Sequence, residues 1–190
     1  MSNDWKKVVA EKASDIIEAD QLSAGSRPLL NNEDSPRDFV HKLAAAEKWP
    51  DAVTVMANCL PRREAVWWVC VCSRKIQNGD DVKALEAAEQ WVFKPTDEGR
   101  VLAFREAQNS TSSSAAALAA LAVASSQSRL SMDERTEIRL DASTFPSLVA
   151  AAILVAEEKV AENEGASPFR LFLDMGENIA QGGNGRVEKE

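Results

Sequence analysis

Histidine is the side chain that most often acts as a general base in proteins, and this chain contains a single one, His41. A nucleophilic triad would need His41 beside a serine or cysteine, but the sequence contains no Gly-x-Ser-x-Gly turn of the kind that presents a catalytic serine. Tyrosine, another acid/base group, is absent. We therefore predict no catalytic residue and no enzyme. The rival hypothesis is an enzyme or small-ligand-binding protein whose site is assembled from scattered residues such as Glu64, Arg100 and His41.

The three cysteines, Cys59, Cys70 and Cys72, are the remaining candidates for a metal site. On a helix, residues two apart point about 200° away from each other, so Cys70 and Cys72 could not bind one ion together. On a strand they would share a face, but two thiolates are still too few for a zinc site. We expect buried, free thiols in a reducing compartment, with no metal and no cofactor.

Tryptophan is the most distinctive residue type, with five in the chain. Trp67 and Trp68 are adjacent, so on a helix they lie about 100° apart and can both be buried only if that helix is central. Exposed tryptophan is a favoured interface anchor, so one of the pair could instead face a partner. Basic residues bracket the pair, and they either cover the core with their aliphatic stems or form a basic patch for an acidic partner. The candidate partner-binding residues are Trp67, Trp68, Arg62, Arg63 and Arg74.

The overall charge narrows the class of partner. The chain has 190 residues, a net charge of −8 and a pI near 4.9, so it repels phosphate backbones and anionic membrane surfaces. Its longest apolar runs fall far short of the roughly 20 residues that a membrane-spanning helix needs. The N-terminus lacks the apolar region of a signal peptide. We therefore expect a cytoplasmic protein that binds another protein, with no nucleic-acid partner and no membrane insertion. The oligomeric state stays open.

Helix-start signals, several of them a capping residue followed by proline, recur along the chain. Together with apolar residues at helical spacing, these signals predict about eight or nine helices. Four of them are predicted to span residues 5–19, 62–76, 115–124 and 145–161. The others are predicted to begin at residues 36, 50, 97 and 168 and just after Asn78 or Asp80. Residues 125–141 are polar and weakly periodic, which predicts an exposed loop, and no pair of segments carries a hairpin signal. The glycine-rich run at 182–185 follows the last helix instead of preceding one, which predicts a helix end and not a phosphate loop.

The eight consecutive apolar residues at 65–72 decide the fold class. The run is rich in valine and tryptophan and could be a buried strand. Its segment between Pro61 and Gly79 is long for a lone strand and no partner strand lies nearby, which favours a helix in the middle of a bundle. The predicted fold is therefore all-α: a single compact bundle of short helices, or stacked helical pairs, over residues 1–181. A flexible charged tail follows at 182–190.

Several runs resemble an uncharacterised bacterial family of all-helical domains. They are Arg37-Asp38-Phe39-Val40, Pro61-Arg62-Arg63-Glu64-Ala65-Val66-Trp67-Trp68, Trp91-Val92 with Pro95-Thr96, and Phe169-Arg170 with Phe172-Leu173 and Ile179-Ala180. Some members of that family are associated with type VI secretion gene clusters. The resemblance implies no activity and no catalytic residues. The leading hypothesis is a non-enzymatic helical interaction module, namely an adaptor, chaperone or scaffold, accessory to a bacterial secretion system.

Overall fold

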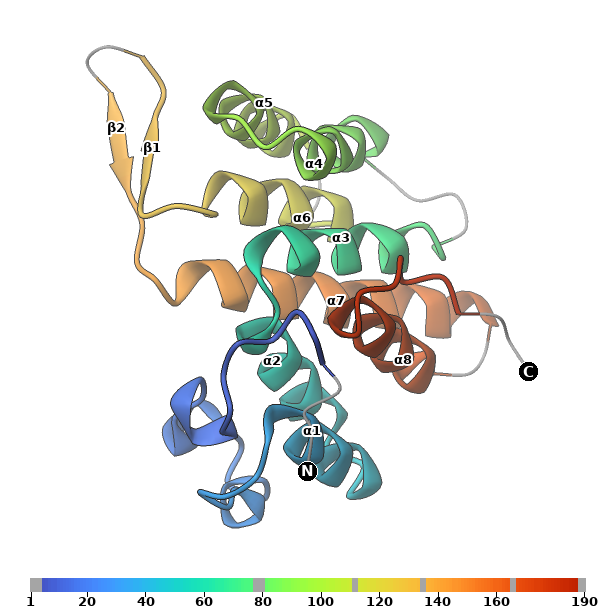
Figure 1. The fold of residues 1–190 in the computed structure, drawn as a ribbon. Helices are drawn as coiled ribbons and strands as arrows, with labels where there is room; N and C mark the ends of the chain where they lie inside the picture. The colour runs from blue at the N-terminus through green and yellow to red at the C-terminus, as the bar shows by residue number, and fades with distance from the viewer. Residues whose placement is uncertain (1–4, 77–80, 111–112, 134–135, 165–166, 188–190) are drawn as a thin grey trace.

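Helices dominate the structure. The computed structural model of the protein describes residues 5–76, 81–110, 113–133, 136–164 and 167–187, which form eight α-helices and a two-stranded antiparallel sheet (Figure 1). The helices are α1 (Pro36–Ala45), α2 (Trp49–Cys59), α3 (Arg62–Ser73), α4 (Val82–Phe93), α5 (Asp97–Gln108), α6 (Ala115–Ala124), α7 (Thr144–Glu164) and α8 (Phe169–Ala180). The strands are β1 (Arg129–Ser131) and β2 (Glu137–Arg139). The predicted all-α bundle is confirmed, and no helix within the described ranges is long and apolar enough to cross a membrane.

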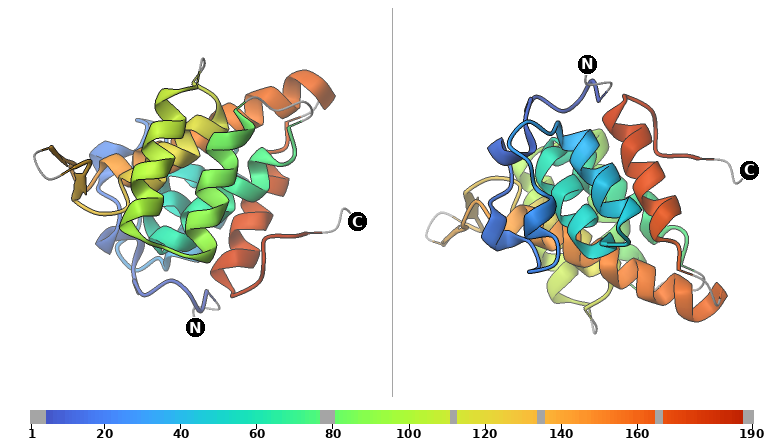
Figure 2. Two further views of the ribbon diagram at one scale, coloured as in Figure 1. Left: turned by 90° about the horizontal axis from the view of Figure 1, so that it is seen from above. Right: turned by 90° about the horizontal axis from the view of Figure 1, so that it is seen from below.

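Three helices form the middle of the bundle. In Figure 1, α3, α6 and α7 lie between the α4–α5 pair and the α1–α2 pair, and the views in Figure 2 show these pairs on opposite sides. The apolar run at 65–72 is helical, as predicted, because α3 packs against α4, α6, α7 and α8 and so needs apolar residues on several faces. The alanine-rich α6 is buried along most of its length, and its small side chains let α4, α5 and α7 pack closely around it.

Three of the predicted helices begin at a capping hydroxyl group. The hydroxyl oxygens of Ser35, Thr96 and Ser114 accept hydrogen bonds from backbone amides in the first turns of α1, α5 and α6. The caps predicted for α4 at Asn78 and Asp80 lie outside the described residues. This helix begins after Asp81, whose φ of 59° is left-handed and whose side chain makes no capping hydrogen bond.

The helix predicted at residues 5–19 is wrong. This segment instead runs over the bundle in turns, with a short 3-10 helix at Ala13–Asp15 and the start of another at Ala19–Gln21. The apolar spacing that suggested a helix does bury side chains, including Trp5 and Ile17. Two of its backbone amides form hydrogen bonds to distant parts of the chain: the amide of Lys7 donates to Ala180 O (2.9 Å) and the amide of Ala13 to Asp34 O (2.8 Å). Long-range partners have replaced the hydrogen bonds of a helix.

The loop predicted at residues 125–141 is partly wrong as well, because its middle forms the β1–β2 hairpin. Leu130 pairs with Ile138 in the register, and Leu130 is buried while its two neighbours on the strand are exposed. Each strand has only three residues, so the alternation of polar and apolar side chains is too short to stand out in the sequence.

Candidate functional site

The adjacent tryptophans of α3 have different environments. Trp68 is fully buried (0% exposed), and its indole Nε1 donates a hydrogen bond to Phe172 O of α8 (2.8 Å). Trp67, about 100° further round the helix, is only partly buried, and its Nε1 donates to Asn184 O (2.9 Å). Trp68 therefore belongs to the core, whereas Trp67 faces the surface.

An exposed phenylalanine extends the surface around Trp67. The ring of Phe93, the last residue of α4, meets the Trp67 ring edge-on, with centroids 5.8 Å apart and an angle of 63° between the ring planes. Phe93 is 72% exposed, which is unusual for a side chain of this size. Phe93 was not among the predicted site residues, although it directly precedes Lys94-Pro95, where the helix and its core-facing apolar residues end.

Trp67 also borders a cleft of about 470 Å³ between α3, α4, α8 and the segment that follows α8. Apolar side chains from three of these elements line it, namely Val71, Met175 and Val187. The charged residues around it are Arg74, Lys75, Glu89 and Arg186. The cleft thus combines apolar walls with an excess of basic groups.

One wall of this cleft comes from the residues predicted to be a flexible tail. Up to Val187, the described part of that segment lies against the helices: Gly185 is buried, and its amide donates to Asn178 Oδ1 (2.9 Å). Gly185 has a φ of +77°, and a Cβ there would lie 2.9 Å from Ile179 Cδ1. Glycine is therefore required for the turn that carries the chain past Trp67. Residues 188–190 lie outside the described residues.

The structure brings only part of the predicted partner-binding set together. Arg63 and Trp67 are four residues apart on α3, so they share a face, and Arg63 Nε donates to Val92 O beside Phe93. Arg74 lies further along this face, where it forms two hydrogen bonds to the Glu89 carboxylate (2.9 and 2.7 Å).

Arg62 lies on another side of α3. Its guanidinium lies 4.7 Å from the centre of the Phe145 ring, and its Nη1 donates to Ser125 O (3.4 Å). Arg62 and Trp68 therefore lie apart from Trp67, Arg63 and Arg74. We define the Trp67 surface as Trp67, Phe93, Val71, Met175, Val187, Arg63, Arg74, Lys75, Glu89 and Arg186.

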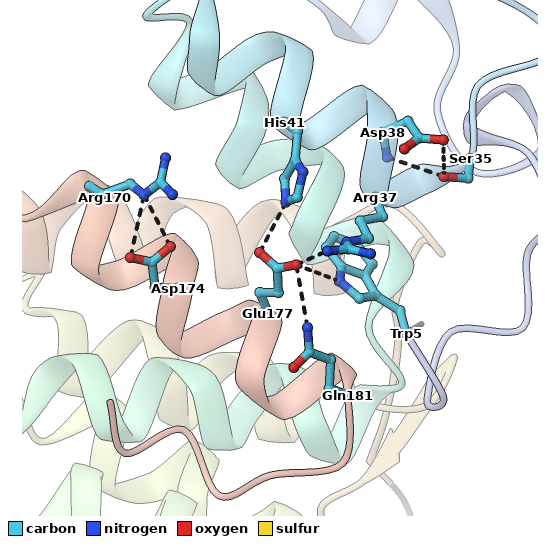
Figure 3. Close-up of polar contacts among 9 residues, drawn as sticks. All are labelled: Trp5, Ser35, Arg37, Asp38, His41, Arg170, Asp174, Glu177 and Gln181. Carbon is cyan, nitrogen blue, oxygen red and sulfur yellow. Dashed lines mark hydrogen bonds and ion pairs between the residues drawn. The ribbon is translucent and has the colours of Figure 1, made fainter. Parts of the chain in front are cut away.

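A second polar cluster surrounds Glu177 of α8 (Figure 3). Its carboxylate, 20% exposed, accepts hydrogen bonds from Trp5 Nε1 (3.3 Å) and Arg37 Nε (3.1 Å), and it lies 3.0 Å from His41 Nε2. These three partners come from the N-terminal segment and α1. Glu177 thus joins two distant parts of the chain to α8.

Burial alone would raise the pKa of Glu177, but the hydrogen bond and charge of His41, the hydrogen bond from Trp5 and the charge of Arg37 together lower it. A carboxylate with a lowered pKa is a poor proton donor or acceptor near neutral pH. The cluster is therefore better suited to holding the N-terminal segment and α1 in place than to catalysis.

Replacing Glu177 with glutamine is expected to lower the free energy of unfolding at pH 7 by about 1.5 kcal/mol, because hydrogen bonds to a charged acceptor are lost. Since the folded-state pKa is lowered, the charge stabilises the fold above the ordinary value of 4.5, and this stabilisation disappears as the pH falls through the folded-state pKa. Denaturation at several pH values should show the difference from wild type shrinking below about pH 4.5. As a control, Asp174→Asn removes an exposed ion pair of the same helix and should have a smaller effect. An unchanged difference at low pH would contradict this role for the charge.

The scattered residues of the rival hypothesis have different partners. Glu64 pairs with Lys7 (3.4 Å), His41 with Glu177, and Arg100 with Asp97 and backbone carbonyls at the end of α6 and in β1. A second cleft, of about 250 Å³, lies between the hairpin and α5, α6 and α7. Its lining includes Phe104, Leu130 and Leu148 and contains no charged side chain. Glu64, His41 and Arg100 therefore lie in three separate sets of contacts, and none of them lines the second cleft.

The cysteines are free and buried, as predicted. Burial raises the pKa of all three thiols, so they are protonated and unreactive at neutral pH. In the described parts of the chain, no three histidine, cysteine or carboxylate side chains lie close enough to hold a metal ion.

The fold and this surface define a class: an all-helical bundle in which a partly buried tryptophan and an exposed phenylalanine lie beside a cleft with an excess of basic groups. The chain belongs to a family of unknown function, DUF6931, whose model matches residues 39–180. The match runs from α1 to the end of α8, so it includes Trp67 and Phe93 but not the segment that forms the cleft wall at Val187. Comparisons with curated proteins and with solved structures find no significant match.

Proposed function

We propose that this protein is a non-enzymatic interaction module that binds another protein through the Trp67 surface. The observation that carries the proposal is the contact of the largely exposed Phe93 ring with Trp67 at the edge of a cleft. Large aromatic side chains are enriched at protein interfaces and supply much of their binding energy. Trp67 also lies on α3, one of the three helices in the middle of the bundle, so a rigid element positions its side chain.

Such a module would act as an adaptor, chaperone or scaffold in the bacterial cytosol. Free, buried cysteines fit a reducing compartment. The resemblance to proteins from type VI secretion gene clusters suggests components of that machinery as the first partners to test. An enzyme or small-ligand binder is the less favoured function, because the charged residues that could serve it are engaged in separate structural contacts.

Replacing Phe93 with alanine is expected to weaken partner binding at least tenfold while leaving the melting temperature nearly unchanged, because an exposed anchor contributes to the interface and little to the core. The probes are peptides selected from a random 16-residue phage library on the wild-type protein, with affinities measured by calorimetry.

The matched control for this experiment is Leu102→Ala, which removes an exposed apolar side chain on α5 (42% exposed). Selected peptides should bind this variant as they bind wild type. If no peptide is enriched, or if the enriched peptides are insensitive to Phe93→Ala, the Trp67 surface is not a binding site and the proposed function fails.

A further inference from the structure

The net charge around the cleft is positive, whereas the net charge of the whole protein is negative. Three cationic side chains, Arg74, Lys75 and Arg186, line it together with one carboxylate, Glu89. The chain as a whole has 22 basic and 30 acidic residues. A local positive excess on a negatively charged protein attracts acidic groups and repels basic ones, which favours one orientation of an approaching partner.

The ion pair between Arg74 and Glu89 does not cancel the positive excess around the cleft. Arg74 and Glu89 satisfy each other through two hydrogen bonds, so they contribute little net charge. In the part of the chain that the structure describes, neither Lys75 nor Arg186 forms an ion pair. Lys75 lies just after α3, where the helix dipole favours a cation, but Arg186 lies in an irregular segment where no helix end accounts for it. Two cations therefore remain available, one at the end of α3 and one in the segment after α8.

The uncharged part of the cleft lining is apolar. Val71, Met175 and Val187 face the cleft, and the Trp67 indole borders it with its one N–H already donated to Asn184 O. A side chain that enters the cleft therefore gains burial more than hydrogen bonds. A volume of about 470 Å³ is ample for one large apolar side chain and the backbone that carries it.

From this arrangement we propose that the partner presents an acidic peptide segment whose central bulky apolar side chain enters the cleft while flanking carboxylates pair with Lys75 and Arg186. This inference rests on the proposed function, and it adds the chemical class of the partner. A nucleic acid fits less well, because two free cations on a chain of net charge −8 can neutralise few phosphates.

The test uses three synthetic peptides that share a Leu-Phe centre and differ only in the two residues on each side: acidic, uncharged amide or basic. The acidic peptide should bind at least tenfold more tightly than the amide peptide. Its affinity should fall as salt rises, because exposed charges are screened. It should also shift the Trp67 indole resonance in NMR spectra.

Reversing the charges of Lys75 and Arg186 is the decisive experiment. The double variant Lys75→Glu/Arg186→Glu should lose at least tenfold in affinity for the acidic peptide and should prefer the basic one. The matched control, Arg129→Glu/Arg139→Glu, makes the same change in net charge on the exposed hairpin and should keep the preference of wild type.

The outcomes separate the two proposals. Equal binding of acidic and amide peptides, or phage-selected peptides that depend on Phe93 but carry no acidic bias, would overturn the acidic partner and leave the interaction module standing. A single-stranded oligonucleotide that displaces the acidic peptide, or dimerisation of the protein that the double variant abolishes, would overturn it in favour of a nucleic acid or a second copy. If Phe93→Ala weakens the binding of neither the phage-selected nor the synthetic peptides, both the proposed function and the acidic partner fail.

Discussion

Replacing Trp68 with alanine is expected to lower the free energy of unfolding by about 3–5 kcal/mol, the usual effect of truncating a buried tryptophan. Trp68 is fully buried, and its indole meets the backbone of α8 so closely that a Cβ on Gly176 would lie 3.0 Å from it. Truncation leaves a cavity between α3 and α8 and removes the hydrogen bond to Phe172 O. Since a domain is stable by only about 5–15 kcal/mol, chemical denaturation followed by circular dichroism should show a large loss.

Trp67→Ala is the matched variant for this prediction. It removes the same side chain from the neighbouring position, but Trp67 is only partly buried, so its effect on stability should be clearly smaller. Its main effect is expected on peptide binding at the Trp67 surface. Trp68→Phe, which keeps most of the packing, should fall between wild type and Trp68→Ala. Equal stability of Trp68→Ala and wild type would place Trp68 outside the core.

Replacing Arg100 with methionine should have the second large effect, a loss of about 2–5 kcal/mol. This guanidinium is buried (3% exposed), and its NH2 donates to Ala124 O (2.8 Å) and Arg129 O (2.6 Å). Arg100 therefore holds the end of α6 and the start of the hairpin against α5. Methionine fills similar space but leaves these carbonyl oxygens without a donor, and orphaned buried acceptors cost about 1–3 kcal/mol each.

Amide hydrogen exchange can localise the effect of Arg100→Met. Amides of β1 and β2 should exchange faster in the variant, while those of α1 and α2, on the far side of the bundle, should change less. Arg105→Met is the control, because it removes an exposed arginine from the same helix and should change stability by less than about 0.5 kcal/mol. Wild-type exchange in the hairpin of Arg100→Met would mean that other contacts hold it.

Local patterns in the sequence were enough to predict most of the fold. The caps at Ser35 and Thr96 and the long apolar run of α3 act within a few residues, so they can be recognised without knowing the tertiary structure. The N-terminal segment could not be predicted in this way. Its amides bond to Asp34 and Ala180, and no local pattern reveals acceptors so distant in the sequence.

The candidate site was only partly predictable for the same reason. Adjacent tryptophans imply two faces of α3, but only the packing of α8 decides that Trp68 is the buried one. Phe93 belongs to the site because α3 and α4 lie side by side, which the sequence of α4 alone does not indicate. Arg100 was considered for a catalytic site, whereas it binds Asp97 and two carbonyl oxygens that lie 24 and 29 residues away.

The alanine-rich α6 has a consequence for how the bundle melts. Alanine has no side-chain rotamers to lose, so this buried helix is ordered at almost no cost in side-chain entropy. In return, its cohesion comes from many weak dispersion contacts between closely spaced backbones, and these decay steeply once the helices move apart. A slight swelling would therefore weaken all the contacts around α6 together. For this reason heating should produce one abrupt transition, with little gradual loosening beforehand.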